Sequence, residues 1–259
     1  MNEIFAFNLL GTTAFIIFVT YIVAGIVDAT CGGGGLITVP SLMGIGMPVH
    51  MVVGTNQCTL VLGCWTSFYE YAKSGKIDYR VAKIAVPFSL AGAFIGSELN
   101  LLIDERYLQI IMIVLIPIMA IIGLIKNDMG KEDRSDEVSE RKVFISSALI
   151  GFIVSTYHAF YGPASGIFYL AAFVVFLKHD AVKANGIGRC ILAFVNVASG
   201  IVYAVSGFIS IKSVAIGTVG YIIGNYIGAK LALKKGIDFI RPVYYLVVVG
   251  LMIKLITTI

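Results

Sequence analysis

The stretch Ala24–Pro40, AGIVDATCGGGGLITVP, determines how the rest of the chain is interpreted. Four consecutive glycines, Gly32 to Gly35, lie in it between two apolar runs, 5–27 and 36–45. Glycine inside a helix costs about 1 kcal/mol relative to alanine, so four in succession predict unwound backbone. The flanking runs are too apolar for this backbone to be a surface hinge. The stretch therefore predicts a broken helix within a membrane.

This broken helix has a functional interpretation and a structural one. Unwound backbone at membrane depth is tolerated only where it is buried in protein or lines a polar cavity. Secondary transporters use such broken helices to build a substrate site near the bilayer midplane. The structural alternative is a close helix-packing seam, which also uses glycine. A seam prefers glycines four residues apart rather than adjacent ones, so the run favours the broken helix.

The composition fixes the fold class. The chain has 259 residues, of which 58% are hydrophobic and 13% charged, and its mean hydropathy is +0.93. A helix needs roughly 20 apolar residues to cross the hydrocarbon core. These values predict an all-α polytopic membrane protein. The formal charge of +4 is dispersed among the loops, so no nucleic-acid partner is expected.

The N-terminus and the cysteines add little chemistry. Met1, Asn2 and Glu3 do not form the basic start of a signal peptide, so we expect the first segment to be retained. The four cysteines show no metal-ligand spacing and are interpreted as buried thiols. Neither a cofactor nor a metal site is predicted.

Apolar segments divide the chain into two sets of five. Two of them, 36–46 and 166–177, are too short to span, and each is second in its set and follows a helix breaker. The sequence thus predicts about eight full spans and two half-helices. The ten segments cover about 5–29, 36–46, 52–72, 80–99, 106–125, 143–160, 166–177, 182–206, 212–232 and 240–258. The predicted domains are a first transmembrane repeat (1–126), a polar linker (127–142) and a second transmembrane repeat (143–259).

The two sets are related as a repeat. A shift of 132 residues aligns 71–99 with 203–231, and ten of these 29 positions are identical. Composition alone would give roughly three identities, so the match indicates an internal duplication. Nearer the N-terminal end of each half the shift falls to 129–131, as gaps in the broken loops would produce.

Loop charges predict that the two halves are inverted. Cytoplasmic loops carry an excess of lysine and arginine. The basic loop at 73–83 corresponds to a second-half loop with only Lys212, whereas the acidic loop at 98–106 corresponds to the basic stretch 230–241. Opposite bias in equivalent loops predicts inverted repeats in the cytoplasmic membrane, with the linker inside and both termini outside.

These motifs also resemble a known family. The run AGIVDATCGGGGLITVPSLMGIGMPVHMVVGTNQ (24–57) is similar to the first-half signature of the TauE/SafE family of sulfite and organosulfonate exporters. GFIVSTYHAFYGPASGIFYL (151–170) resembles the family's repeated half, although its break has fewer glycines. The resemblance implies transport of a small sulfur-containing anion (sulfite, thiosulfate or an organosulfonate) or a related anion across the cytoplasmic membrane. From the paired broken helices of inverted repeats we expect this transport to proceed by alternating access, coupled to an ion. The resemblance fixes neither the anion nor the direction of transport.

An anion site can also be argued from the residues themselves. Unwound glycines expose backbone N–H groups, and each following half-helix, expected to start at Leu36 and at Ile167, offers the positive end of its dipole. Two such N-termini could surround an oxyanion, with hydroxyl and amide side chains beside them. For the two asparagines, a helix cap or an interhelical hydrogen bond is an equal alternative. The candidate substrate-binding residues are Gly32, Gly33, Gly34, Gly35, Thr55, Asn56, Gly162, Ser165, Gly166, Asn185 and Arg189.

Three ionisable residues are candidates for specific roles. Arg189 lies inside an apolar segment, where ionisable side chains face a pathway or snorkel toward the headgroups, and both interpretations stay open. Asp28 and His158 precede the two breaks at comparable positions. Either could carry a coupling proton, and either could instead hydrogen-bond unwound backbone.

Two other classes of function are alternatives to a carrier. A passive anion channel could use the same half-helix geometry. Gly-Pro-Ala-Ser165-Gly is similar to the nucleophile motif of intramembrane serine proteases, which need a histidine base within hydrogen-bond reach. His179 is expected at the membrane surface, and His158 would reach Ser165 only in a favourable fold. The sequence therefore favours a transporter over an enzyme.

Overall fold

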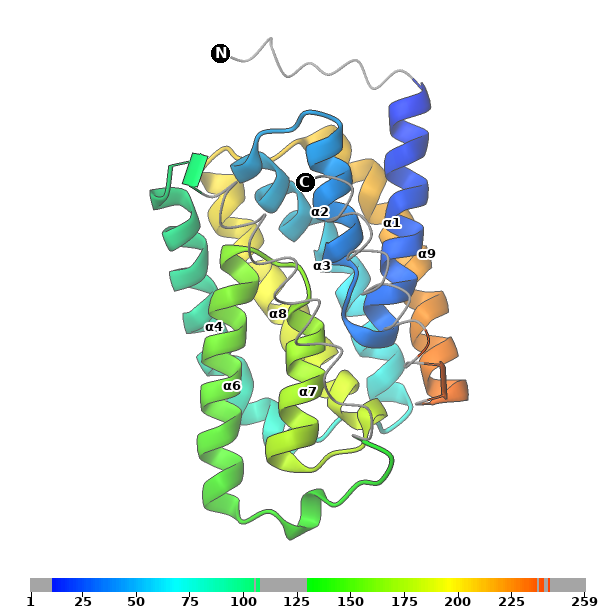
Figure 1. Ribbon diagram of the computed structural model, residues 1–259, viewed down its shortest axis with the longest axis vertical. Coiled ribbons are helices and arrows are strands. Elements are labelled where there is room, and N and C mark those ends of the chain that lie inside the picture. Colours follow the sequence, from blue (N-terminus) through cyan, green and yellow to red (C-terminus); the bar gives the residue numbers. More distant parts are fainter. Residues whose placement is uncertain (1–10, 105, 108–129, 237, 240–241, 243–259) are drawn as a thin grey trace.

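The computed structural model describes residues 11–104, 106–107, 130–236, 238–239 and 242. Within this part the chain is all-helical, with eight α-helices, one 3-10 turn at Ser135–Glu137 and no strand. In Figure 1 the helices form one bundle, with the 130–139 segment at its lower end. The helices are α1 (Gly11–Cys31), α2 (Gly35–Gly44), α3 (Val49–Lys73), α4 (Tyr79–Leu102), α6 (Glu140–Phe160), α7 (Ser165–Leu177), α8 (Ala181–Val205) and α9 (Ile211–Lys235).

The lengths separate full spans from half-helices. Six helices have 21 to 25 residues, which corresponds to about 32–38 Å at 1.5 Å per residue. The helices α2 and α7 have 10 and 13 residues and are too short to span. Four of the long helices, α1, α4, α6 and α8, are also apolar enough to cross a membrane. The expected segments 106–125 and 240–258 lie outside the described residues, apart from residues 106, 107 and 242.

Glycines with positive φ end the two helices that precede the half-helices. Gly32 (φ 83°) follows α1, and Gly162 (φ 101°) follows α6. The left-handed region is open to glycine without a Cβ penalty, so each chain can turn sharply there. Both half-helices begin earlier than expected, α2 at Gly35 instead of Leu36 and α7 at Ser165 instead of Ile167. The expectation was wrong there because a helix tolerates glycine or serine in its first turn, where the amides need no intrahelical acceptor.

Glycine seams join α4 to α6 and α9 to α1. A Cβ built on Gly96 would lie 2.1 Å from the backbone oxygen of Thr156, and one built on Gly228 would lie 2.4 Å from that of Ile26. Neither position admits a side chain, so the helix backbones are in direct contact. Gly96 and Gly228 are aligned by the 132-residue shift of the sequence repeat. The same internal correspondence therefore relates the two seams.

Equivalent tyrosines also make equivalent hydrogen bonds. Tyr71 of α3 donates to the Ala29 carbonyl at 3.0 Å, and Tyr203 of α8 donates to the Ala159 carbonyl at 2.9 Å. Tyr71 and Tyr203 are related by 132 residues, Ala29 and Ala159 by 130. Each bond satisfies a carbonyl in the last turn before a break, where intrahelical donors are missing.

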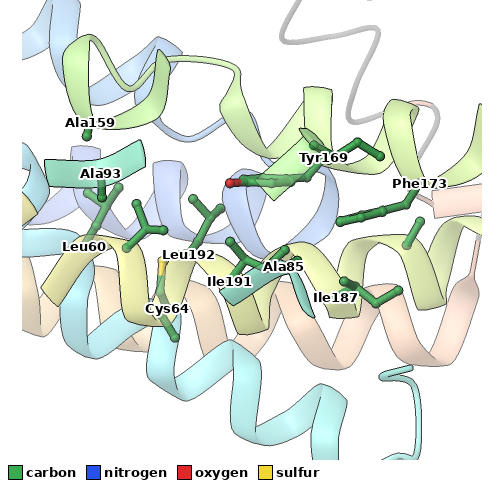
Figure 2. Packing of buried hydrophobic residues seen from close by; sticks show 14 of the residues in the cluster. Leu60, Cys64, Ala85, Ala93, Ala159, Tyr169, Phe173, Ile187, Ile191 and Leu192 are labelled. Carbon is green, nitrogen blue, oxygen red and sulfur yellow. The ribbon is translucent and has the colours of Figure 1, made fainter. Parts of the chain in front are cut away.

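The part of the buried core drawn in Figure 2 is built from side chains of α3, α4, α6, α7 and α8. Tyr169 and Phe173 of α7 stack with their ring centroids 5.9 Å apart, and Ile187 and Ile191 of α8 pack in the same cluster. The most buried of the four apolar spans is α8, with 67% of its window inside the bundle. Every residue of α8 from Ala184 to Ala193 is buried, whereas Ile201 and Val205 near its end are exposed.

Candidate functional site

The two helix breaks meet at the centre of the site. A Cβ built on Gly32 would lie 2.3 Å from Gly166 Cα, and one built on Gly35 would lie 3.0 Å from Pro163 Cα. The breaks after α1 and α6 are thus packed backbone to backbone. From this contact α2 extends upward and α7 downward in Figure 1. The two half-helix N-termini therefore converge, and their dipoles make the region favourable for negative charge.

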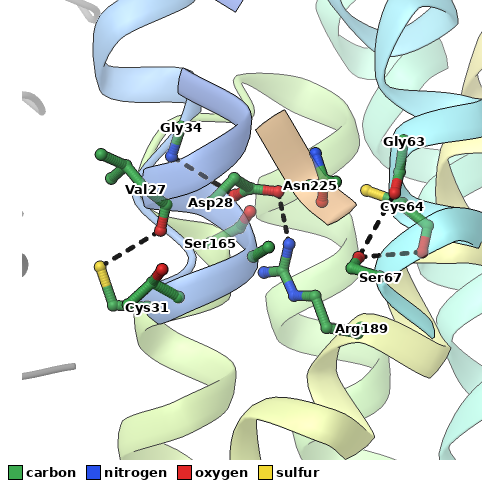
Figure 3. Close-up of polar contacts among 12 residues, drawn as sticks. Val27, Asp28, Cys31, Gly34, Gly63, Cys64, Ser67, Ser165, Arg189 and Asn225 are labelled. Atoms are coloured by element: carbon green, nitrogen blue, oxygen red, sulfur yellow. Dashed lines mark hydrogen bonds and ion pairs between the residues drawn. The ribbon is translucent and has the colours of Figure 1, made fainter. Parts of the chain in front are cut away.

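A protein carboxylate occupies this region (Figure 3). Asp28 Oδ1 accepts a hydrogen bond from the Gly34 amide at 3.3 Å, at the start of α2. Asp28 Oδ2 accepts from Arg189 Nη1 and from the Tyr221 hydroxyl, the latter at 2.5 Å. Both members of the ion pair are buried, with side-chain exposures of 6% for Asp28 and 0% for Arg189. The donors form an oxyanion-binding arrangement whose ligand is the protein's own aspartate.

The guanidinium of Arg189 has further donors. In the described part of the chain, Arg189 Nε and Nη2 have no hydrogen-bond acceptor. Nη2 lies 2.5 Å from the position that a Cβ on Gly166 would take, so it faces the first turn of α7. The side chain turns inward to Asp28 rather than along α8 toward the headgroups. Buried donors without partners are costly, and they indicate a place where another acceptor could bind.

A series of hydrogen bonds between uncharged side chains lies at the second break. Ser165 Oγ lies 2.5 Å from His158 Nδ1, and Asn196 Oδ1 lies 2.9 Å from His158 Nε2. Asn196 Nδ2 donates to Cys64 Sγ at 3.2 Å, which orients its oxygen toward the histidine. With Asn196 Oδ1 as the acceptor, a neutral imidazole donates from Nε2–H to Asn196 and accepts at Nδ1 from Ser165. His158 therefore reaches Ser165, as the hydrolase interpretation required.

The remaining predicted side chains lie around the breaks at different distances. Asn185 Nδ2 donates to the Ala29 and Thr30 carbonyls at 2.9 Å, at the end of α1. Asn56 Oδ1 accepts from Tyr21 at 3.3 Å. Thr55 instead accepts from the amide of Ser210, which precedes α9, at 2.9 Å. Its hydroxyl is therefore engaged away from the two N-termini.

Several polar residues at the site were missed by the sequence reasoning. Tyr221 holds Asp28, Asn196 holds His158, and Gln57 Nε2 donates to the His158 carbonyl at 2.7 Å. Each lies within a mostly apolar helix, which is the signal that singled out Arg189. Tyr71, which donates to Ala29 and accepts from Asn185 at 2.7 Å, was visible as an identity in the repeat.

A charged cluster joins the 130–139 segment to two loops at the end where α4 and α8 begin. Lys183 pairs with Asp133, Arg80 with Glu140 at 3.0 Å, and the amide of Arg134 donates to the Lys178 carbonyl at 2.9 Å. The side chains of Asp78 and Asp180 cap α4 and α8.

Inside this cluster, the buried His179 ring lies 3.7 Å from an Asp78 oxygen and 3.6 Å from an Asp133 oxygen. Burial lowers the pKa of His179, and the neighbouring carboxylates of Asp78 and Asp133 oppose this shift.

Among the described residues, no group of three or more His, Cys, Asp or Glu side chains is placed to hold a metal ion. The donors at the break junction are an amide, a guanidinium and a hydroxyl, which are groups that hydrogen-bond to carboxylates and other oxyanions.

Comparison with known proteins places these features in a family. The family model described as "Sulfite exporter TauE/SafE" matches residues 17–255. The "Probable membrane transporter protein ORF9" of Sinorhizobium sp. is 27% identical over 97% of this chain and 94% of its own length. The "Probable membrane transporter protein" of Haemophilus influenzae is 30% identical over 88% of each chain. "Probable membrane transporter protein YfcA" of Escherichia coli is 27% identical over 93% of this chain and 88% of its own length.

No solved structure matches the chain significantly. The matched region spans α2 through α9 and most of α1, and it contains both breaks, the Asp28–Arg189 pair and the two seams. The chain belongs to the TauE/SafE family of membrane transporter proteins.

Proposed function

We propose that this protein is a secondary transporter that moves a small sulfur-containing anion, such as sulfite, thiosulfate or an organosulfonate, across the cytoplasmic membrane. The observation that carries the proposal is the meeting of two half-helix N-termini at the buried guanidinium of Arg189. Backbone amides, a hydroxyl and one guanidinium are hydrogen-bond donors that match the oxygens of a sulfonate or sulfite group. The sulfur chemistry comes from the description of the family.

Alternating access would follow from an inverted repeat. In Figure 1 α1 descends from the top of the molecule, whereas α6, its counterpart, ascends from the bottom. The Gly96 and Gly228 seams and the paired Tyr71 and Tyr203 hydrogen bonds support the same correspondence. Rocking of one repeat against the other about the fixed junction would expose the site to each side in turn.

The orientation proposed places the linker in the cytoplasm and both termini outside. The basic loop at 73–83 and the linker lie at one end of the bundle, as the Arg80–Glu140 pair shows. The positive-inside rule assigns that end to the cytoplasm. In a background from which Cys58 is removed, a cysteine introduced at Asp136 should resist a membrane-impermeant maleimide in intact cells. One introduced at Asp104 should react, and the reverse pattern would contradict the orientation.

Ion coupling is the third part of the proposal. Asp28 and His158 precede the two breaks at positions related by 130 residues, and both lie against the junction. A carboxylate and an imidazole are groups that can carry a proton across a transport cycle.

A thermal-shift screen of the purified protein tests the substrate class. Sulfite, thiosulfate, sulfate, sulfoacetate, taurine and small carboxylates would be compared at equal ionic strength. A ligand present at 100 times its Kd stabilises the protein by about 2.7 kcal/mol. Selective stabilisation by a sulfur oxyanion supports the proposal, whereas stabilisation by carboxylates alone contradicts it. Flux that does not saturate would favour a passive channel.

The contact between His158 and Ser165 favours intramembrane hydrolysis as a second candidate function. A histidine within 2.5 Å of a serine hydroxyl can act as its general base. The third group is the neutral Asn196 rather than a carboxylate, and the relatives bear transporter names. A fluorophosphonate probe distinguishes the two functions, because labelling of Ser165 in the intact protein would support the hydrolase.

A further inference from the structure

The Asp28 carboxylate is bound in the way that a substrate oxyanion would be. Its two oxygens accept from the Gly34 amide at the start of α2, from the Tyr221 hydroxyl and from the Arg189 guanidinium. These donors come from three different helices or their ends, α2, α9 and α8. In Figure 3 the carboxylate lies between Gly34 and Arg189. Carboxylate, sulfite and sulfonate groups all present oxygens that can bridge such donors.

The remaining donors at this place have no acceptor in the protein. Arg189 Nε and Nη2 lack a hydrogen-bond partner among the described residues, although the Arg189 side chain is fully buried. Nη2 faces Gly166 in the first turn of α7. An anion that displaced Asp28 could therefore use the whole guanidinium and the N-terminus of α7, which a single carboxylate does not reach.

Charge balance restricts what can happen to Arg189. A buried guanidinium without a counterion is strongly disfavoured in a low-dielectric environment. Arg189 must then be paired either with ionised Asp28 or with a bound anion. A bound anion next to ionised Asp28 would place two negative charges against one positive charge. A proton on Asp28 removes this conflict, and the site remains neutral in both states when the anion is monovalent.

We propose that Asp28 is a built-in surrogate for the substrate. Its carboxylate occupies the anion site in the unloaded transporter and leaves that site when it takes up one proton. This inference rests on the proposed anion transport and specifies its coupling. The Asp28 carboxylate gains a proton from the aqueous side that the site faces, its bond to Arg189 breaks, and the anion takes its place. One proton then accompanies each monovalent anion, so proton and anion move in the same direction.

The other ionisable groups around Asp28 do not duplicate this role. They are Arg189 on α8, Tyr221 on α9, Cys31 on α1, Cys64 on α3 and His158 on α6. Arginine stays charged, and the tyrosine and the buried cysteines are neutral in this environment. His158 is held as a neutral ring between Ser165 and Asn196. Asp28 is the group in direct contact with the guanidinium.

The test compares anion binding and proton uptake in the purified full-length protein. Methanesulfonate serves as the probe because it is a monovalent anion whose charge is constant across the pH range used. Where Asp28 is ionised, the apparent affinity of the wild type should rise about tenfold for each unit that pH falls, with about one proton taken up per methanesulfonate bound. Asp28→Asn should bind the same probe at least tenfold more tightly at pH 8, with no proton uptake and no pH dependence. Asp136→Asn, in the exposed linker, is the matched control and should behave as the wild type.

Asp28→Asn leaves Arg189 without a counterion and can fail to fold. In that case the pH dependence and the proton uptake of the wild type decide the matter, and recovery of the folded variant by added methanesulfonate would be further support. Wild-type binding that is independent of pH, with neither uptake nor release of a proton, would overturn the surrogate role of Asp28. It would not contradict the proposed anion transport. Absence of binding and transport of every anion tested, in wild type and variant alike, would overturn the proposed function itself.

Discussion

Arg189 of α8 pairs with Asp28 of α1 across 161 residues of sequence, and both side chains are buried. The pair joins the helix before the first break to the most buried span of the bundle. Because the pair lies where the N-termini of α2 and α7 converge, substitution of either residue should affect both the stability of the fold and anion binding at the site.

This pairing predicts the effect of removing one charge. Arg189→Gln leaves the Asp28 carboxylate buried without its cation, which costs about 3–5 kcal/mol for a buried pair. The double variant Asp28→Asn/Arg189→Gln has no unbalanced charge and should regain most of this loss. Thermal melting of the single and double variants in detergent measures the coupling. Additive losses in the double variant would show that the two residues do not interact.

The start of α2 predicts a second effect. A Cβ on Gly34 would lie 2.6 Å from Asp28 Cβ and 2.7 Å from the Ala24 carbonyl oxygen. Gly34→Leu should therefore abolish transport, because the side chain would separate the amide of residue 34 from Asp28, while membrane insertion continues. Gly44→Leu is the control at the other end of the same helix, where a Cβ meets nothing within 4 Å. Normal flux through the Gly34 variant would show that the start of α2 does not contribute to the site.

The paired tyrosines predict unequal losses of stability. Tyr203→Phe leaves the Ala159 carbonyl without its donor and should destabilise by about 1 kcal/mol. Tyr71→Phe should cost less, because the Ala29 carbonyl still accepts from Asn185 Nδ2, and Asn185 keeps the Ala29 and Thr30 carbonyls as acceptors. Melting temperatures of both variants, measured in the same detergent, provide the comparison. An equal or larger loss for Tyr71→Phe would contradict the hydrogen bond from Asn185 to the Ala29 carbonyl.

The charged cluster at the 130–139 segment, which contains His179, predicts a pH dependence of stability. Burial lowers the pKa of His179 below its ordinary value of about 6.5, against the pull of Asp78 and Asp133. The unfolded chain then takes up a proton at a higher pH than the folded chain. Stability should be constant above about pH 7 and fall as pH decreases through about 6.5.

Replacing the imidazole tests that pH dependence. His179→Gln should flatten the decrease, as followed by melting temperature across this range. Lys178→Gln removes a neighbouring charge, which pairs with Glu137, and keeps the imidazole, so it should retain the wild-type slope. A slope that persists unchanged in His179→Gln would assign the effect to other groups.

Much of the fold could be predicted from local patterns. The lengths of the apolar segments predicted the described helix ends to within three residues. For α1 this applies to its C-terminal end alone, because Gly11 is the first residue that the structure describes. The length criterion also identified α2 and α7 as too short to span. The glycine run and Gly162 marked the breaks, because a positive φ is costly for any other residue.

The contacts within the site could not be predicted in the same way. That Arg189 meets Asp28 rather than the headgroups depends on how α1 packs against α8, which no local pattern specifies. The meeting of His158 with Ser165 likewise depends on the turn after α6, where Ala164 takes a left-handed conformation. Tyr221 was missed because a tyrosine in an apolar helix is most often core or interfacial.

Uptake of labelled thiosulfate into proteoliposomes tests the proposed transport most directly. The wild type is compared with Asp28→Asn/Arg189→Gln, in which the charge balance of the site is preserved and its guanidinium is lost. We expect saturable uptake by the wild type and at least a tenfold lower rate in the double variant. Saturable uptake at the wild-type rate by the double variant would contradict an anion site built on Arg189.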